Sequence, residues 1–214
     1  MKIAARSANF IVAFLKSYGP SNVKKYFWDK EFGGTKWDFI DHTEGDCVYE
    51  SLKRYTNNGS VLDLGCGPGN TANELSTDVY QKYIGVDISE EALAKARRRT
   101  MEAGRGDQNS FVQHDFVSYR PSQEFDVILF RESIYHVPIG KIKETLSHYA
   151  KYLKRDGVFV IRIATSDKEH GGVDKPRPMA MVQLLEREFD VVEKLRYNHV
   201  SRPLVLVLRP KPRA

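Results

Sequence analysis

The feature that most constrains this chain is an apolar segment that breaks into alternating glycines. Residues 61–64 read Val-Leu-Asp-Leu, and residues 65–70 read Gly-Cys-Gly-Pro-Gly-Asn. Glycines after a strand let a ligand approach the backbone, and a following helix turns its free N–H groups toward that ligand. Asn70 stands where the dinucleotide-binding pattern has its third glycine. The segment therefore predicts a phosphate- or carboxylate-bearing ligand other than NAD.

Four further landmarks follow the glycine run in order. They read Ile-Gly-Val-Asp-Ile-Ser at 84–89, His-Asp-Phe at 114–116, Phe-Asp-Val-Ile-Leu-Phe at 125–130 and Leu-Lys-Arg-Asp-Gly-Val at 153–158. With Asp63–Gly69 they resemble the motifs of class I S-adenosylmethionine-dependent methyltransferases. The resemblance implies a doubly wound α/β fold with a seven-stranded, mostly parallel sheet in the order 3-2-1-4-5-7-6. It also implies S-adenosyl-L-methionine as cofactor and S-adenosyl-L-homocysteine as product.

Hydrophobic periodicity points to the same architecture. Short apolar runs alternate with helical periods, as in a parallel sheet covered on both faces. The predicted parallel strands are Val61–Leu64, Tyr83–Val86, Phe111–Gln113, Val127–Phe130 and Val158–Ile163. Runs at 191–195 and 204–208 predict an antiparallel pair. A helix is expected after Ser89 and another after Pro138, the second with an apolar stripe of Ile139, Ile142, Leu146, Ala150 and Leu153.

The N-terminal residues show no strand signal and are dense in aromatic side chains. We expect residues 1–45 to form a helical cover over the ligand edge of a Rossmann-like domain at 46–214, within one structural domain. The short apolar run at 10–15 lacks a cleavage site, so an amphipathic helix is favoured over a signal peptide. No apolar run reaches the length of a transmembrane helix.

Composition and charge indicate the kind of compartment and the kinds of partner to expect. Two cysteines, Cys47 and Cys66, are too few for a disulfide framework or a cysteine-rich metal site, which favours a reducing, cytoplasmic compartment and no bound metal. The net charge of +5 allows an acidic partner without requiring one. Basic clusters such as 97–99 are interpreted as solvated faces, with a nucleic-acid patch as the alternative.

The glycine loop is the predicted centre of the cofactor site. The first strand is the natural switch point of the sheet, where ligands of open α/β folds bind. The resemblance implies that Gly65, Cys66, Gly67 and Gly69 line the methionine portion of the cofactor and that Asp63 engages its ammonium group. Cys66 is interpreted as a small space-filling residue rather than a nucleophile.

Two carboxylates follow the next two strands. The resemblance implies that Asp87 accepts hydrogen bonds from the ribose hydroxyls and that Ile88 packs on adenine. It also implies that Asp115 accepts from the adenine amino group and that Phe116 adds a ring contact. The alternatives are that Asp87 only caps the following helix and that Asp115 is an ordinary turn residue.

The stretch after the fourth strand is the predicted reaction site. Residues 131–138 read Arg-Glu-Ser-Ile-Tyr-His-Val-Pro and resemble a segment of ubiquinone-type small-molecule O-methyltransferases. His136 is the candidate catalytic base, because the pKa of free histidine lies near neutrality; the alternative is that it only holds the loop. Arg131 and Glu132 are expected to organise the methionine end of the cofactor.

Aromatic residues of the cover and a polar loop are the other candidates near the transferred methyl group. Trp37, rather than Tyr26 or Trp28, is the preferred residue to close over the sulfonium. The alternative is that all three form a hydrophobic seam between the cover and the sheet. A polar, glycine-bearing loop after the fifth strand is expected to line the acceptor pocket, through Arg162, Thr165, Ser166 and His170–Gly172.

The absence of certain motifs reduces the number of possible methyl-acceptor classes. Residues 131–138 contain no Asn/Asp-Pro-Pro-aromatic sequence, no cysteine and no second glutamate beside Glu132. These absences disfavour exocyclic base amines, 5-methylcytosine chemistry and protein arginine as targets. The chain is therefore interpreted as a methyltransferase acting on oxygen or nitrogen of a small-molecule acceptor. The alternatives are an RNA or protein methyltransferase and a non-catalytic cofactor-binding protein.

Overall fold

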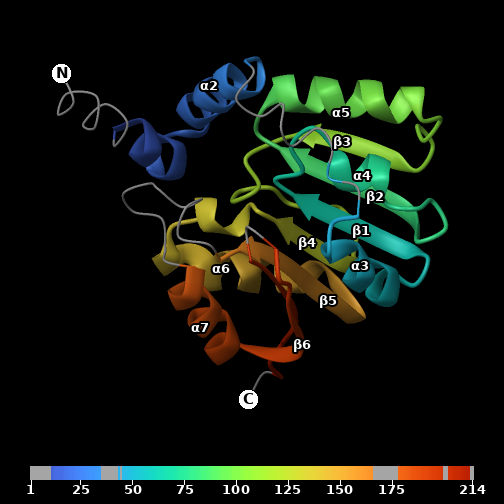
Figure 1. Cartoon of the computed structure of the whole chain (residues 1–214). Helices are drawn as coiled ribbons and strands as arrows, with labels where there is room; N and C mark the ends of the chain where they lie inside the picture. Colours follow the sequence, from blue (N-terminus) through green and yellow to red (C-terminus); the bar gives the residue numbers. More distant parts are fainter. Residues whose placement is uncertain (1–10, 35–42, 44, 166–177, 200–201, 213–214) are drawn as a thin grey trace.

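The computed structural model describes residues 11–34, 43, 45–165, 178–199 and 202–212. A seven-stranded sheet runs through the molecule in the order β3-β2-β1-β4-β5-β7-β6 (Figure 1). Pairing is parallel from β3 to β5, and β7 is antiparallel to both of its neighbours. The strands are β1 (Gly59–Leu64), β2 (Tyr80–Asp87), β3 (Asn109–Gln113), β4 (Phe125–Arg131), β5 (Leu153–Ala164), β6 (Phe189–Arg196) and β7 (Pro203–Pro210). The predicted fold class and strand order are confirmed.

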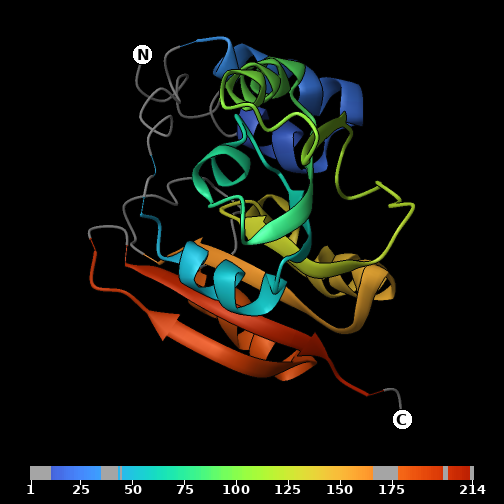
Figure 2. The ribbon, with the colours of Figure 1, turned by 90° about the vertical axis from the view of Figure 1, so that its right-hand side faces the viewer.

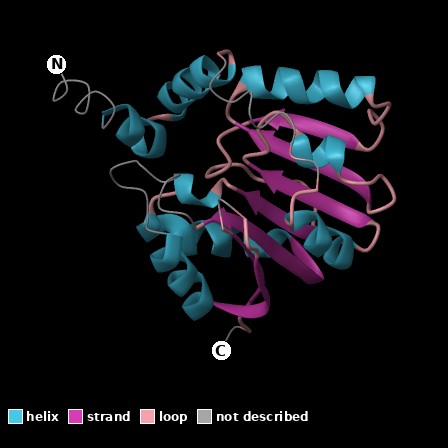
Figure 3. Cartoon of the chain, in the orientation of Figure 1, coloured by secondary structure: helices cyan, strands magenta, loops and turns pink. Residues whose placement is uncertain are grey.

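Helices cover both faces of this sheet (Figures 2 and 3). They are α2 (Ser21–Phe32), α3 (Val48–Thr56), α4 (Asn70–Glu74), α5 (Glu90–Glu102), α6 (Ile139–Tyr149) and α7 (Pro178–Glu188), with 3-10 turns η2 (Ile134–His136) and η3 (Ala150–Tyr152). Side chains of α3 and α4 share one buried core with Val61, whereas those of α6 and α7 share the other with Leu62 and Leu64. Successive residues of β1 thus enter opposite cores, which explains its almost uninterrupted apolar sequence.

The helix predicted after Ser89 has the expected ends. The Ser89 hydroxyl accepts a hydrogen bond from the Ala92 N–H at 3.2 Å, and two glutamates occupy the first turn of α5. Gly104 follows α5 with φ of 65°, a left-handed conformation that glycine adopts without strain.

The predicted apolar stripe of α6 is wrong at both ends. Ile139 is 43% exposed, so it lies outside the core. Ala150 belongs to the η3 turn, and Leu153 begins β5, where it is the register partner of Phe125. The helical period continues through these residues in the sequence, but strand pairing decides their conformation.

The structure describes part of the N-terminal segment for which a helical cover is predicted, residues 11–34, 43 and 45. Residues 11–18 are helical, and α2 follows them across the carboxyl-terminal edge of the sheet (Figure 1). Of the twelve residues of α2, Phe32 is the buried one. None of the helices within the described ranges has the length and apolar character needed to cross a membrane.

Candidate functional site

Three glycines make the bend that follows β1. Gly65, Gly67 and Gly69 have φ of 80°, 54° and 74°, which side-chain-bearing residues rarely adopt. The bend is tied to β2, because the N–H groups of Gly65 and Cys66 donate to the Val86 carbonyl at 2.8 and 3.1 Å. Since β1 lies between β2 and β4, the bend lies at the topological switch point.

Asp63 is a buried carboxylate near the end of β1. It is 1% exposed, and Oδ2 accepts a hydrogen bond from the Tyr83 hydroxyl. Within the described residues, Oδ1 has no hydrogen-bond partner. Burial raises the pKa of Asp63 to about 6. An acceptor left unsatisfied inside a protein is costly, so the arrangement suits a ligand that brings a donor or a positive charge.

Asp87 joins the bend to α5. Its Oδ2 accepts from the Gly67 N–H at 2.8 Å and its Oδ1 from the Ser89 N–H at 2.9 Å. Burial raises the pKa of this carboxyl to about 6. The predicted capping contact therefore exists, and it also fixes the carboxylate beside the glycine bend. Each carboxylate oxygen keeps a second lone pair for a ligand hydroxyl.

Asp115 is held by the cover. Its Oδ1 accepts from the Val117 N–H at 3.1 Å, a turn contact of the kind given above as the alternative. Its Oδ2 accepts from the Ser21 hydroxyl at 3.1 Å and the Lys24 ammonium at 3.0 Å. The predicted ring contact, Phe116, packs edge-on against Phe130 at 6.0 Å between ring centroids.

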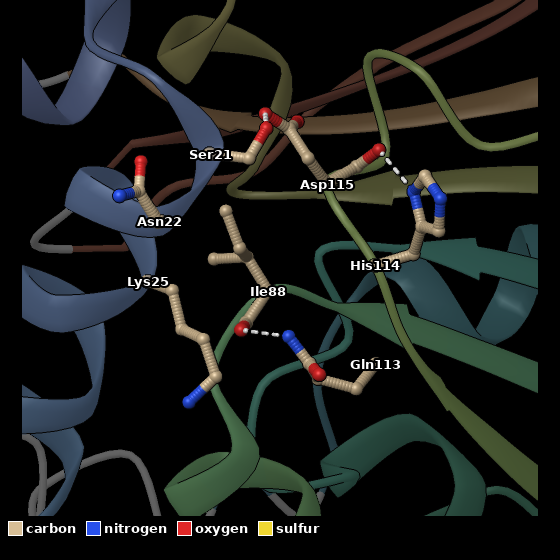
Figure 4. Close-up of a pocket in the computed structure, with 7 residues that line it drawn as sticks. All are labelled: Ser21, Asn22, Lys25, Ile88, Gln113, His114 and Asp115. Atoms are coloured by element: carbon tan, nitrogen blue, oxygen red, sulfur yellow. Dashed lines mark hydrogen bonds between the residues drawn. The ribbon is translucent and has the colours of Figure 1, made fainter.

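A pocket of about 370 Å³ opens between α2 and the ends of β2 and β3 (Figure 4). The side chain of Ile88 lies between Asp115 and the α2 residues in this view. The pocket is lined by Ser21, Asn22, Lys25, Ile88, Gln113, His114 and Asp115. The structure thus brings together two of the three residues predicted at the adenine, Ile88 and Asp115, and adds α2 as an opposite wall, whereas Phe116 does not line this pocket.

An ion-pair network that the sequence did not reveal lies at the ends of β4 and β5. Arg131 and Arg162 are register partners on these strands. Both face Asp46, at 2.8 Å from Arg131 and 3.4 Å from Arg162, and Arg162 also pairs with Glu132. Burial alone would raise the pKa of Asp46, but the two guanidinium groups hold it below its usual range. Arg131 also donates to the Tyr49 hydroxyl at 3.2 Å.

Asp46 and Tyr49 were missed because they precede the first strand and belong to no recognisable motif. The sequence did place two arginines, Arg131 and Arg162, at the ends of adjacent strands. Buried arginines need a carboxylate nearby, so this pair predicts an acidic partner. That signal does not say where along the chain the acid lies.

His136 faces the cover helix. It ends the η2 turn, and its ring centroid lies 4.8 Å from that of Trp28 with the planes nearly perpendicular. The Ser133 hydroxyl donates to the Leu64 carbonyl at 2.5 Å and so ties the loop before η2 to β1. The Lys16 ammonium lies 3.4 Å from the ring centroid of Trp28. Tyr26 is 61% exposed, so the described structure gives it no place over the site.

The predicted acceptor loop lies partly outside the described residues. Trp37, Ser166 and His170–Gly172 belong to the ranges that are not described. Of the described members, Arg162 is held in the ion-pair network, and the Thr165 hydroxyl donates to the Arg202 carbonyl at 2.6 Å.

Comparison with known proteins finds a family match inside the chain. The family described as "Methyltransferase domain" matches residues 61–157, which include the bend, both buried carboxylates and β4. Residues 61–157 of this chain are similar to a methyltransferase domain. The sequence-based recognition is therefore confirmed, and the cover and the β6–β7 pair lie outside the matched segment.

Curated relatives of this methyltransferase domain act on different acceptors. The sterol 24-C-methyltransferase erg6 of Aspergillus fumigatus is 25% identical over 168 residues, covering 73% of this chain and 43% of the relative. The protein-lysine N-methyltransferase EFM4 of Saccharomyces cerevisiae is 31% identical over 120 residues, covering 50% of this chain and 52% of the relative. The chain spans about half or less of the length of these relatives.

Solved structures share the fold over most of the chain. A DhpI–SAH complex has a TM-score of 0.71 at 20% identity, covering 92% of this chain and 100% of the other. The N-methyltransferase NodS of Bradyrhizobium japonicum, solved with S-adenosyl-L-homocysteine, has a TM-score of 0.68 at 16% identity, covering 88% and 98%. At these identities the likeness establishes the fold alone.

Proposed function

We propose that this protein is an S-adenosylmethionine-dependent methyltransferase that transfers a methyl group to oxygen or nitrogen of a small-molecule acceptor. One observation carries the proposal: a glycine bend at the switch point lies between two buried carboxylates, Asp63 and Asp87, and one oxygen of Asp63 has no hydrogen-bond partner among the residues that the structure describes. A ligand with a cationic group and a diol satisfies both carboxylates. S-Adenosylmethionine has both groups, and the matched family supports it as the ligand.

The residues present fit this cofactor. Asp63 would accept from its ammonium group, Asp87 from the ribose hydroxyls, and Asp115 from the adenine amino group beside Ile88. Gly65 and Gly67 leave the backbone open to the methionine portion. When bound, the cofactor supplies a methyl group activated by a sulfonium. The protein's own task is to align the acceptor with that group and to exclude water.

His136 is the proposed base. It lies on the turn after β4, beside the switch point, and the perpendicular contact with Trp28 restricts its ring. An acceptor hydroxyl or ammonium must lose a proton during transfer, and the imidazole can take it. Because α2 crosses this edge of the sheet, the site is covered on one side, which favours a small acceptor over a folded macromolecule (Figure 1).

Transfer to carbon is the second candidate. The named activity of the sterol relatives is methylation at carbon 24, and the match to the Aspergillus fumigatus relative extends over 73% of this chain. A protein lysine is a further alternative acceptor, because one relative is named as a yeast protein-lysine N-methyltransferase. Incubation with methyl-labelled cofactor and separate panels of amines, phenols, sterols and lysine peptides distinguishes these classes.

Titration calorimetry with S-adenosylhomocysteine tests the cofactor site. Asp87→Ala should weaken binding about tenfold to a hundredfold, the range for one hydrogen bond to a charged group. Asp107→Ala, which removes an exposed carboxylate, is the matched control. Unchanged affinity in a folded Asp87→Ala protein would refute the ribose role, and no binding to the wild type would refute the proposed function.

A reducing, cytoplasmic compartment is part of the same proposal. Cys47 and Cys66 are both free thiols in the structure, which fits such a compartment.

A further inference from the structure

A bend made of three glycines keeps its shape only if contacts from outside fix it. Gly65, Gly67 and Gly69 all have positive φ, and glycine adopts many other conformations as readily. The hydrogen bonds described above fix the first half of the bend against β2. The second half, at Pro68 and Gly69, lies against α5 instead.

The helix α5 packs directly on this second half. A Cβ built on Gly69 would lie 2.7 Å from the Cβ of Ala96, so the backbone of the bend touches the helix. Arg99 stands three residues after Ala96 and thus on the same face of α5. Its Nη1 donates to the Pro68 carbonyl at 3.2 Å and to Oδ1 of Asn70 at 3.0 Å.

The peptide unit between Pro68 and Gly69 is therefore held at both of its polar groups. Its carbonyl accepts from Arg99, and its N–H donates to the Cys66 carbonyl at 3.1 Å. A peptide plane with both groups bonded resists rotation, which stabilises the positive φ of the glycines beside it. Arg99 thus supplies the anchor that β2 does not give to this half of the bend.

A buried acid holds Arg99 in place. Glu74 ends α4, its side chain is 6% exposed, and its Oε1 lies 3.4 Å from Nη2 of Arg99. Glu74 also accepts from the Asn70 amide at 3.2 Å and from the Tyr49 hydroxyl at 2.7 Å. The guanidinium therefore bridges the bend and a carboxylate that α3 fixes from the other side.

Arg99 departs from the interpretation of residues 97–99 as a solvated face. Its side chain is 24% exposed, whereas that of Arg98 is 67% exposed and lies 4.0 Å from an equally exposed Glu102. Two neighbouring arginines of one helix thus differ in whether they contact the bend. They form a matched pair for an experiment.

We propose that Arg99 is a positioning residue for the methyl donor, which holds the glycine bend from α5 in the conformation that receives the cofactor and acts through the Pro68 carbonyl. This inference rests on the proposed function, because it takes the bend as the place where the cofactor binds. Without the guanidinium, the ligand-free bend populates other glycine conformations. The apparent affinity then falls in proportion to the fraction that remains competent.

Titration calorimetry with S-adenosylhomocysteine compares Arg99→Met with Arg98→Met. Arg99→Met should bind about tenfold more weakly than the wild type, the equivalent of one hydrogen bond to a charged group, and Arg98→Met should bind as the wild type does. Arg99→Lys keeps the charge but cannot donate to all three acceptors named above, so its affinity should lie between the two. Equal affinities of Arg99→Met and Arg98→Met would overturn the proposal.

A second comparison covers the case in which Arg99→Met does not fold. Arg99→Lys is then compared with Arg98→Lys, and equal affinities of these two variants would likewise overturn the positioning role. Failure of the wild type itself to bind S-adenosylhomocysteine would instead overturn the proposed function, so the two failures are distinguishable.

Amide hydrogen exchange separates positioning from a general loss of stability. Without ligand, the peptide that covers residues 65–74 should exchange faster in Arg99→Met than in Arg98→Met, because the bend opens locally. Saturation with S-adenosylhomocysteine should remove this difference. Equally accelerated exchange in β5 and β7 would show that Arg99 supports the whole fold, and it would overturn the proposal.

Discussion

Replacing Asp63 by asparagine should make the stability of the ligand-free protein less sensitive to rising pH. Burial raises the pKa of this carboxyl from 3.8 to about 6, so the folded chain holds its proton more tightly than the unfolded chain. The stabilisation from Asp63 is therefore fully present below pH 3.8 and is lost as pH rises toward and through 6. Asparagine cannot ionise, so the variant lacks this loss.

The size of the effect follows from the two pKa values. Their difference corresponds to about 3 kcal/mol of unfolding free energy, of which about 1.4 kcal/mol falls between pH 5.0 and pH 7.5. Asp87 has a similarly raised pKa and is present in both proteins, so the comparison isolates Asp63 together with its repulsion by the Asp87 charge. The asparagine oxygen can still accept the Tyr83 hydrogen bond, which preserves the local packing.

Urea unfolding at pH 5.0 and pH 7.5 measures the difference. The wild type should lose about 1.4 kcal/mol more than Asp63→Asn between these pH values. Asp107→Asn, at an exposed position, should follow the wild type. If the unfolding free energies of Asp63→Asn and the wild type change by the same amount between the two pH values, Asp63 ionises as easily in the folded chain as in the unfolded one. That result would refute the argument from its burial.

Three further predictions address the base, the ion-pair network and the backbone. His136→Ala should slow methyl transfer far more than it weakens S-adenosylhomocysteine binding; wild-type turnover would leave this residue a structural role. Asp46→Asn should lower the unfolding free energy by about 3 kcal/mol, because it leaves Arg131 buried without its nearest carboxylate, and a loss below about 1 kcal/mol in urea unfolding would count against the network. Gly69→Ala should destabilise by roughly 1–3 kcal/mol, because φ is 74° and the new Cβ would meet the Ala96 Cβ at 2.7 Å. Gly140→Ala, in open space within α6, should instead stabilise by about 0.5–1 kcal/mol, and thermal melts of the two variants separate these outcomes.

The sheet could be predicted from sequence because its signals are local. A buried strand such as β1 is apolar on both faces, and Ser89 begins its helix with a side chain that caps it. The resemblance then supplied the strand order. The end of α6 was wrong because Leu153 pairs with Phe125, a contact between residues far apart in the chain that no local period reveals.

The same difference between local and long-range signals explains which residues of the candidate site could be predicted. Asp63 and Asp87 could be predicted because Asp63 is the next-to-last residue of β1 and Asp87 is the last residue of β2, and the structure buries both beside the bend. The partners of Asp115 and Arg131 could not, because Lys24 and Asp46 come from the segment before β1, where no motif fixes their place. Tertiary packing alone brings these charges together.

The cover has a consequence for how such enzymes diversify. The family match begins at residue 61, yet α2 forms one wall beside His136 and one wall of the pocket at Ile88. A recombination event upstream of β1 would exchange those walls in a single step and leave the glycine bend and its two acids intact. Under the proposed function, a change of this leading segment alters the wall beside His136 and the wall of the adenine pocket together, so acceptor preference and cofactor affinity change in the same step.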